Sequence, residues 1–411
     1  MRYRRLIFAA TIGNALELFD FTVYSFFAAV IGKVFFPVGG EYGPLLLSFA
    51  TFGVGFLTRP LGGIVLGAYA DRAGRKAAMT LTILLMAIGT AIIGLTPSYA
   101  QLGIAAPLLV VFGRLIQGFS AGGEVGATMA FLMESATADR RGYFISWQMT
   151  GQGAAPLIGA LVGVVLTYSL SQEALEGWGW RVPFLLGLLI GPVGFFIRRH
   201  LDETHHWTPT IRGAETKQRF DWCRIALGTL IMIGGTSTMY IMVYYLPSYL
   251  TKIGNLPPTT ALTSGCMAGV ALMLLSPIGG RLADRLVRRK PIALATSGIS
   301  LLVVLPLFAL VVRNPGLGTV IPTVGILIGL MALASASGSL LLIEGFPAAV
   351  RVRSLGVIYS IGVSLCGGFS PFIVTWAVKV SGNPYAPGIY VATCSLLSFI
   401  SLVVFVEKKM D

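Results

Sequence analysis

The sequence has few charged residues and few residues of the kinds that build metal or catalytic sites. Charged side chains make up 11% of its 411 residues, whereas a soluble domain carries roughly 25%, so a large soluble protein is excluded. Its four cysteines occur singly, at positions 223, 266, 366 and 394, which predicts neither a disulfide framework nor a zinc site. All three histidines fall between positions 200 and 206, and there is no HExxH motif. We therefore expect no enzyme, no metal site and no cofactor.

Apolar residues, in contrast, are abundant and gathered into long runs. They form 55% of the chain, the mean hydropathy is +0.80, and about 20 apolar residues suffice for a helix to cross a bilayer. Twelve such runs lie at about 6–32, 45–70, 77–96, 103–133, 143–170, 181–198, 223–250, 259–286, 291–312, 316–346, 350–380 and 386–406. The sequence predicts an all-α membrane protein with twelve transmembrane helices.

Lysine and arginine are distributed unevenly between these runs. Of the 30 basic residues, 23 lie at the two termini and in every second break. Because cytoplasmic loops carry the excess of Lys and Arg, both termini are predicted to be cytoplasmic. The longest polar stretch lies halfway along the chain. We expect an N-terminal six-helix bundle at 1–198, a cytoplasmic linker at 199–222 and a C-terminal six-helix bundle at 223–411. The positive charge belongs to loops and does not indicate nucleic-acid binding.

A half-length repeat supports this division. Gly67, Asp71, Arg72 and Arg75 recur 213 residues later as Gly280, Asp284, Arg285 and Arg288, as a transporter of two pseudo-symmetric halves would show. Gly67 would allow close helix approach, and the charges would latch one bundle against the other. A basic turn required only for topology is the alternative. The predicted conformational gate comprises Gly67, Asp71, Arg72, Gly74, Arg75, Asp284 and Arg285.

The first run carries acids within an apolar helix. Asn14, Glu17, Asp20 and Tyr24 fall within an arc of about 120° at helical periodicity. An ionised acid at the bilayer centre costs roughly 2.5–3.5 kcal/mol, so such groups face a functional site or a charged partner. Glu17, Asp20 and Glu124 are candidate proton-coupling residues, and a structural ion pair with an arginine is the alternative.

Two arginines also fall inside apolar runs. Arg59 lies mid-run, and Arg114 shares one helix face with Gln117 and Glu124. A guanidinium is always charged and its planar fork of donors suits a carboxylate. Each arginine therefore binds an anionic substrate or pairs with a buried acid, and the residues alone leave both alternatives open.

Polar residues in other runs complete the candidate substrate site. Gln148 and Gln152 lie one helical turn apart, as do Tyr240 and Tyr244 and, later, Ser360 and Ser364. Such side chains line a pathway or form interhelical hydrogen bonds. The full set of candidate substrate ligands is Arg59, Arg114, Gln117, Gln148, Gln152, Asn14, Tyr24, Tyr240, Ser360 and Ser364.

These motifs resemble one family over nearly the whole chain. Gly67-x-x-x-Asp71-Arg72-x-Gly74-Arg75-Lys76 matches the signature of the major facilitator superfamily. Glu17-Leu-Phe-Asp20, Arg59-Pro-Leu-Gly-Gly63 and the segment from Arg114 to Glu124 resemble its metabolite:proton symporter branch. Ser146-Trp147-Gln148-x-x-x-Gln152 and the segment from Tyr359 to Pro371 are most similar to its citrate and tricarballylate carriers.

The resemblance implies a proton-coupled symporter of a di- or tricarboxylate in a bacterial inner membrane. It implies a carboxylate substrate and protons as partners, with surrounding lipid, and we expect a monomer. A carrier of a zwitterion such as proline or betaine is the alternative, although such members usually have a long C-terminal extension and this chain ends at Asp411. A channel would differ from either carrier in showing no saturation and no strict proton dependence.

Overall fold

The computed structural model describes residues 11, 14–15, 18–73, 75–134, 136–188, 221–286 and 288–407. In this part of the chain every regular element is a helix, so the expected all-α fold is confirmed. Nine of the described helices are long and apolar enough to cross a membrane, and the bent pair Leu18–Phe26 and Ala28–Phe35 passes the same test together. The shorter helix Thr80–Leu95 matches the third predicted run. The sixth run, 181–198, is described only as far as residue 188.

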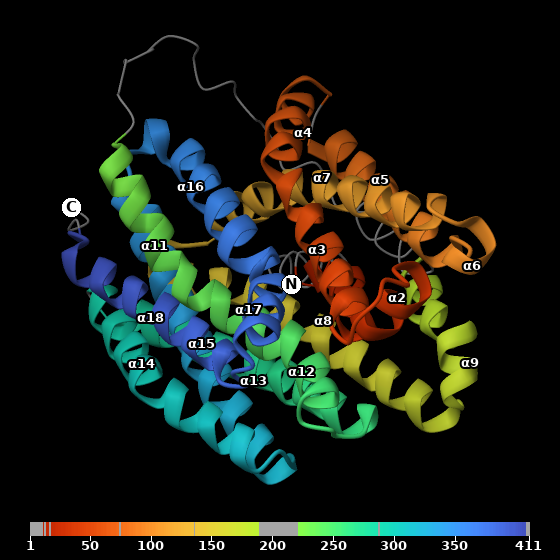
Figure 1. The fold of residues 1–411 in the computed structure, drawn as a ribbon. Helices are drawn as coiled ribbons and strands as arrows, with labels where there is room; N and C mark the ends of the chain where they lie inside the picture. The colour runs from red at the N-terminus through yellow and green to blue at the C-terminus, as the bar shows by residue number, and fades with distance from the viewer. Residues whose placement is uncertain are drawn as a thin grey trace.

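The helices before the expected linker form one group (Figure 1). They are α2 (Ala28–Phe35), α3 (Gly43–Leu57), α4 (Arg59–Ala73), α5 (Arg75–Leu95), α6 (Tyr99–Leu102), α7 (Ala105–Glu134), α8 (Arg141–Ser169) and α9 (Gln172–Gly177), with short 3₁₀ turns at Ala138–Arg140 and Gly179–Arg181. α3 and α4 together make the single span Gly43–Tyr69. α7 packs against α3, α4 and α5 and so lies at the centre of this group.

The helices after residue 220 form the second group. They are α11 (Trp222–Met239), α12 (Leu246–Lys252), α13 (Pro258–Arg285), α14 (Lys290–Arg313), α15 (Leu317–Gly345), α16 (Ala348–Val363), α17 (Ser370–Ser381) and α18 (Ala386–Val404). Two spans in this group contain a π-helical segment: η3 (Tyr240–Tyr245) joins α11 to α12, and η4 (Ser364–Gly368) joins α16 to α17. π-helical turns inside α-helices occur frequently at functional sites.

The first span is bent, which its continuous apolar pattern does not predict. The helical segment 18–26 and α2 meet at Phe27 with an angle of 71°. Backbone hydrogen bonds continue through the bend, from Phe27 N to Val23 O and from Ile31 N to Phe27 O. After the bend α2 packs on α3, where Gly32 approaches the backbone of Pro44 too closely for a Cβ. The bend therefore brings α2 against the start of α3, and Gly32 allows the two backbones to come close.

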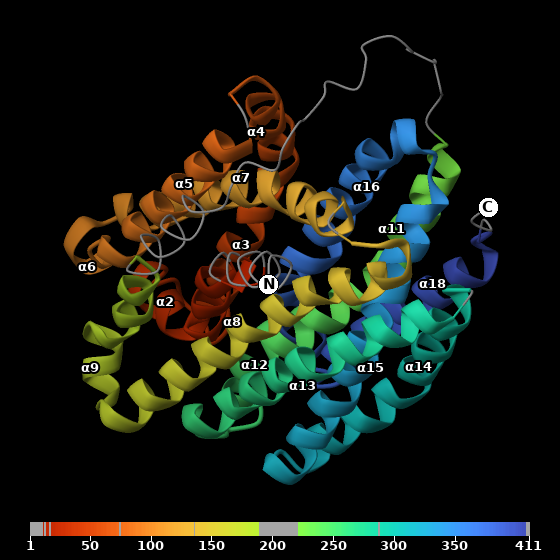
Figure 2. The same cartoon turned by 180° about the vertical axis from the view of Figure 1, so that it is seen from behind.

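The two groups meet along several helices. α8 of the first group packs along α13 of the second, and both views show the two helices side by side (Figures 1 and 2). Elsewhere α3 packs on α17 and on η4. Residues 189–220, which include nearly all of the expected linker, lie outside the described part of the chain. The centre of the molecule is therefore formed jointly by α3, α7, α8 and the two π-helical segments.

Candidate substrate and proton site

Arg59 is a buried cation at the centre of the molecule. It begins α4, in the middle of the span Gly43–Tyr69, and is 5% exposed. Its guanidinium carbon lies 4.2 Å from the centroid of the Phe56 ring and 5.1 Å from that of Phe21. Its Nε and Nη2 atoms have no hydrogen-bond partner among the residues that the structure describes. The rings stabilise the cation but leave its donors available.

Arg114 of α7 is a second buried cation beside the first. It is fully buried, and its guanidinium carbon lies 3.7 Å from the ring centroid of Tyr24 and 5.3 Å from that of Phe21. Nη1 donates to Gln117 Oε1 at 2.8 Å, whereas Nε and Nη2 have no partner. Across the described ranges, neither Arg59 nor Arg114 forms a salt bridge. Since burying a charge without a counter-ion is costly, guanidinium donors that have no described partner are suited to bind an anion.

Asp20 is the described acid of this centre. It is 4% exposed, and its Oδ2 accepts hydrogen bonds from the Thr90 hydroxyl and, at 3.4 Å, from Gln117 Nε2. Its Oδ1 has no partner within the described ranges and lies against Gly187, where a Cβ would come within 2.5 Å of it. Glycine at position 187 therefore leaves the space that this carboxyl oxygen occupies.

Glycines bring the two arginine-bearing helices together. A Cβ on Gly118 of α7 would overlap the carbonyl of Gly55 in α3, and one on Gly122 would overlap the carbonyl of Arg59. Close backbone packing of this kind is typical of membrane helices with small residues at their interface. The stretch from Gly118 to Gly122 also has the GxSxG spacing found around the nucleophilic serine of some hydrolases. The Ser120 hydroxyl, however, is buried and donates to Thr82 O. The spacing serves helix packing here.

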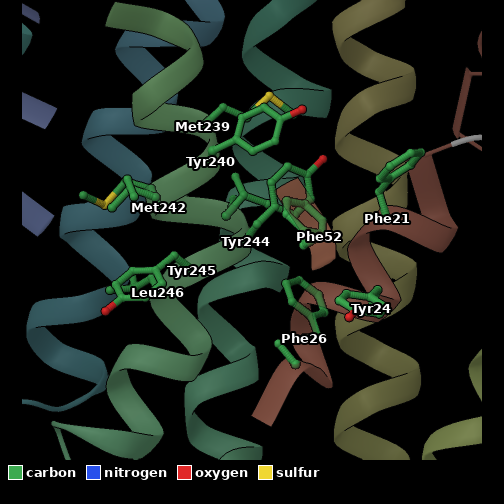
Figure 3. Close-up of a cluster of buried hydrophobic side chains, with 14 of the residues drawn as sticks. Phe21, Tyr24, Phe26, Phe52, Met239, Tyr240, Met242, Tyr244, Tyr245 and Leu246 are labelled. Carbon is green, nitrogen blue, oxygen red and sulfur yellow. The ribbon is translucent and has the colours of Figure 1, made fainter. Parts of the chain in front are cut away.

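An aromatic cluster from both groups covers the arginines. Phe52 and Phe56 of α3 face Tyr240 and Tyr244 of η3, with ring centroids 5.5 Å apart for Phe56 and Tyr240 and 6.1 Å apart for Phe52 and Tyr244. Figure 3 shows the Tyr240, Tyr244 and Phe52 rings between η3 and the helix that carries Phe21 and Tyr24. All of these rings are buried. The two groups are thus in contact through rings directly over the buried charges.

Hydrogen bonds to backbone carbonyls join the groups at the same level. Ser25 Oγ donates to Tyr244 O at 2.6 Å, and Ser364 Oγ of η4 donates to Phe56 O at 2.9 Å. Both bonds involve a π-helical segment. Ser364, a predicted substrate ligand, therefore uses its hydrogen to connect the two groups in this conformation.

The other predicted ligands occupy separate positions around this centre. Asn14 is buried and its Nδ2 donates to Gln148 O at 2.9 Å. Gln148 is 2% exposed and its Nε2 has no partner, and Gln152 is also buried. Ser360 lies half-buried on α16, one turn before Ser364. Glu17 and the side chain of Glu124 lie outside the described part of the chain.

Asp284 connects the groups at the end of α8. Its Oδ1 accepts from Gly142 N at 2.6 Å and its Oδ2 from Tyr143 N at 2.8 Å, so the carboxylate caps the N-terminus of α8, where it also interacts favourably with the helix dipole. Arg281 lies over the Tyr143 ring at 5.0 Å. α13 of the second group thereby holds the first turn of α8 in the first group.

The remaining gate residues give a mixed result. Arg72 and Arg285 are exposed, whereas Gly74 and the side chains of Asp71 and Arg75 lie outside the described residues. The expectation that Gly67 allows close helix approach is wrong, because a Cβ there would meet no described atom within 4 Å. Gly118 and Gly122 provide that approach instead, against Gly55 and Arg59, about two to three helical turns before Gly67.

Ion pairs lie at the opposite end of the bundle. Lys252 Nζ, at the end of α12, is 3.3 Å from Glu41 Oε1 in the other group. Lys33 Nζ is 2.6 Å from Glu176 Oε1 within one group. Partial burial raises the pKa of Glu176, but hydrogen bonds from Lys33 and Gln172 outweigh this effect and bring the pKa below its usual value. Only the Lys252 pair of these two connects the groups.

Several residues of the centre carry no signal in the sequence. Phe21, Phe52 and Phe56 are ordinary apolar residues of apolar runs, and their role as ring partners of the arginines follows only from the packing. Thr90 is a threonine in an apolar helix, where a bond to its own backbone would be the default. These residues can be recognised only by their proximity to Arg59 and Asp20, and that proximity cannot be known before it is known which helices are neighbours.

Comparison with known proteins agrees with the fold. The sequence matches the family described as Major Facilitator Superfamily over residues 10–371. The citrate-proton symporter of Klebsiella pneumoniae is 36% identical, covering 95% of this chain and 90% of its own. That of Salmonella typhi is also 36% identical, covering 98% and 94%. A putative proline/betaine transporter of Staphylococcus aureus strain MSSA476 is 34% identical, covering 97% and 87%.

Solved structures with the same fold are also transporters. A crystal structure of a D-xylose-proton symporter superposes with a TM-score of 0.82 at 18% identity and covers both chains in full. A partially occluded inward-open structure of the xylose transporter XylE from E. coli gives a TM-score of 0.79 at 20% identity, covering 99% and 98%. At this identity the likeness establishes the twelve-helix fold and not the substrate.

Proposed function

The chain belongs to the Major Facilitator Superfamily, and from this premise we propose that it is a secondary active transporter that imports a di- or tricarboxylate together with protons. The observation that carries the substrate class is the pair of buried guanidinium groups of Arg59 and Arg114, whose free donors have no acidic partner among the described residues. Relatives named citrate-proton symporters support this reading. The substrate would supply the hydrogen-bonded carboxylates that these two cations lack among the described residues.

Binding would use the forks of both arginines. A carboxylate accepts two parallel N–H bonds from one guanidinium, and Arg59 and Arg114 each offer Nε and Nη2, the two donors such a pair needs. Both cations contact the Phe21 ring, so a substrate with two carboxylates could bridge them across that ring. Gln117 holds Arg114. Gln148, whose Nε2 has no partner among the described residues, would contribute a polar contact, as would Gln152, Asn14, Tyr24 and Tyr240.

Proton coupling would use Asp20. The acid is buried next to Arg114 and has a free carboxyl oxygen, so protonation changes the net charge of the substrate site itself. Glu17 and Glu124 stay as further candidates by their places in the motifs. Substrate and proton together would then neutralise the centre, which favours closure of the two halves around it.

Alternating access would move two bundles, 1–198 and 223–411, about this centre, with 199–222 as their cytoplasmic linker. Asp284 on the end of α8 would act as a latch that opens when the transporter opens on that side. Gly67, Asp71, Arg72, Gly74, Arg75 and Arg285 would form the remainder of the gate. We place both termini on the cytoplasmic side of a bacterial inner membrane and expect a monomer.

One observation favours a zwitterion as the second candidate. The rings of Phe52, Phe56, Tyr240 and Tyr244 lie beside Arg59, and aromatic faces bind quaternary ammonium groups. Proline or betaine could place its carboxylate on Arg59 and its cation on these rings. A relative named as a putative proline/betaine transporter is 34% identical.

Thermal-shift titration of the purified protein distinguishes a carboxylate carrier from a zwitterion carrier. A ligand that binds only the native state stabilises it by RT ln(1 + [L]/Kd), so citrate, tricarballylate, 2-oxoglutarate, succinate, proline and betaine should be compared at equal concentration. We expect stabilisation by the carboxylates, and its loss in Arg59→Ala but not in the exposed-arginine variant Arg313→Ala. Stabilisation by proline or betaine alone would reject the carboxylate assignment.

A further inference from the structure

Thr90 of α5 contacts three groups at the centre of the first bundle. Its Oγ1 lies within hydrogen-bonding distance of Asp20 Oδ2, is 2.9 Å from Met86 O, and accepts from Gln117 Nε2 at 2.9 Å. A hydroxyl has one hydrogen and can accept two bonds. It therefore donates either to the Asp20 carboxyl or to the Met86 carbonyl, and never to both at once.

The protonation state of Asp20 selects between these two arrangements. An ionised carboxylate only accepts, so the Thr90 hydrogen points to Asp20 Oδ2. A protonated carboxyl can itself donate to Thr90 Oγ1, and the Thr90 hydrogen then turns to Met86 O. In both cases the Thr90 hydrogen has an acceptor and Gln117 still donates to Thr90 Oγ1, and no heavy atom has to move. When Asp20 takes up a proton, the hydrogen bond between Thr90 and Asp20 therefore reverses its direction.

Gln117 extends this arrangement to the substrate site. Its Nε2 donates to Thr90 Oγ1 and lies 3.4 Å from Asp20 Oδ2, while its Oε1 accepts from Arg114 Nη1 at 2.8 Å. Hydrogen bonds in such a chain polarise one another in a medium of low dielectric constant. An ionised Asp20 strengthens the donation by Gln117 and with it the hold of Gln117 on Arg114. A protonated Asp20 relaxes that hold.

Resting on the proposed role of Asp20 as the proton site, we propose that Thr90 is a positioning residue that transmits the protonation state of Asp20 through Gln117 to Arg114. A proton on Asp20 then loosens the hold of Gln117 on Nη1 of Arg114, so that the guanidinium can turn its unpartnered Nε and Nη2 donors toward a substrate carboxylate. This gives the order of events: protonation precedes tight substrate binding.

The surroundings leave few other groups for this role. Arg114 is the charged side chain that acts on Asp20, and Arg59 contacts the same Phe21 ring as Arg114. Tyr24 lies under Arg114. α5 and the segment 182–188 contribute Thr90 and Gly187, neither of which titrates. Glu17 and the Glu124 side chain are not among the described groups.

The test replaces the hydroxyl and follows the carboxyl directly. Infrared difference spectroscopy of the purified full chain, titrated with acid, detects the protonated carboxyl band that is absent in Asp20→Asn. Thr90→Val keeps the shape but removes a donor to the ionised acid, and a bond to a charged group is worth about tenfold or more in an equilibrium constant. We expect the titration midpoint to move up by about one pH unit in Thr90→Val and in Thr90→Ala, and to return in Thr90→Ser.

A second readout follows the link to Arg114. Citrate affinity, measured as a thermal shift, should lose most of its pH dependence in Thr90→Val and keep it in Thr90→Ser. Thr96→Val is the matched control, because the buried Thr96 hydroxyl donates to the backbone oxygen of Ile92, one turn earlier in the chain. This variant should behave as wild type in both readouts.

The spectra distinguish a failure of the proposed proton site at Asp20 from a failure of the proposed role of Thr90. If the carboxyl band that titrates in wild type persists in Asp20→Asn, the proton site lies elsewhere and the inference falls with it. If the band is lost in Asp20→Asn but titrates at the wild-type midpoint in Thr90→Val, only the role of Thr90 is rejected. A Thr90→Ser variant that resembles Thr90→Val rejects it as well, since the hydroxyl would then not be the group that matters.

Discussion

At the scale of single residues, the centre depends on how a guanidinium differs from an ammonium. The guanidinium carbons of Arg59 and Arg114 lie over the Phe56 and Tyr24 rings, and a planar guanidinium can stack on a ring face while its N–H edges stay available. Lysine carries its charge at a point, has no plane to stack and forms no bidentate pair. The two positions therefore require arginine for geometry as well as for charge.

The first prediction concerns Arg59. Removing two charge-assisted hydrogen bonds, each worth roughly 1.5–3 kcal/mol, should weaken carboxylate binding in Arg59→Ala by about a hundredfold or more. Arg59→Lys should recover little of this loss, because the ammonium cannot reproduce the fork. Titration calorimetry on the purified variants, with Arg313→Lys as an exposed control, measures the effect. Near-wild-type affinity in Arg59→Lys would show that only the charge matters.

The second prediction concerns proton coupling. Asp20→Asn resembles the protonated acid in shape and charge but cannot release a proton, so it should still bind and exchange substrate while losing accumulation driven by a pH gradient. Glu17→Gln and Glu124→Gln are the alternatives that the motifs leave open. Uptake and counterflow in proteoliposomes separate the two activities, with the exposed Glu173→Gln as control. Gradient-driven accumulation at the wild-type level in all three variants would contradict the assignment.

At the scale of helices, the second bundle holds the end of α8 through one carboxylate. Asp284 accepts from two backbone N–H groups that have no partner inside their own helix. Because the half-length repeat pairs Asp71 with Asp284, we expect Asp71 to cap the start of α16 in the same way. The repeat thus predicts two latches related by the pseudo-symmetry of the bundles.

The third prediction tests the Asp284 latch. Asp284→Asn removes a charge from a helix N-terminus and leaves one acceptor oxygen, a change worth about 1 kcal/mol. Amide exchange at Gly142 and Tyr143 should speed up by roughly fivefold, while equilibrium substrate affinity changes little because the site is elsewhere. Hydrogen-exchange mass spectrometry of the first turn of α8 measures this, and the exposed capping residue of α11, in Asp221→Asn, serves as control. Unchanged exchange at α8 would mean that the cap does not hold the helix.

The helices also show how far the sequence could lead. Arg59 and Arg114 were predictable because a charge in an apolar run is costly and so conspicuous. Thr90 and Gly187 were not, since a threonine or glycine in an apolar helix is unremarkable until its neighbour Asp20 is known. Gly67 was chosen from its motif, but the motif does not say which glycine packs.

Backbone irregularities were hidden for a similar reason. The bend at Phe27 and the π-helical segments η3 and η4 keep the apolar composition of the helices around them. Hydropathy reports how long a span is, and it is insensitive to a local change of hydrogen-bond register. The twelve-run pattern therefore predicted the fold, while the positions where the spans deviate toward the site needed the three-dimensional structure.

At the scale of the whole molecule, contacts join the two bundles at three levels. Asp284 holds α8 at one end, the rings and serine hydroxyls close the centre, and Lys252 pairs with Glu41 at the other end. A transporter that opens on one side must break the contacts on that side and keep the others. The ion pair is accessible to solvent, with 37% of the Lys252 side chain and 65% of the Glu41 side chain exposed.

The fourth prediction follows from that exposure. A partly exposed ion pair is worth at most about 1 kcal/mol, so it tunes the balance between states without locking one of them. Glu41→Lys replaces attraction to Lys252 by repulsion and should raise the population open at this end by up to about fivefold. Glu176→Lys makes the same exchange against Lys33 within a single bundle, so it should leave the balance between the states unchanged.

Spin labels at Gly39 and Thr259, one in each bundle, report the separation of the bundles by pulsed electron paramagnetic resonance. The longer distances should gain weight in Glu41→Lys alone, and added salt should move the wild type toward the same distribution because it screens the pair. An equal shift in Glu176→Lys would trace the effect to surface charge in general and remove Lys252 and Glu41 from the gate.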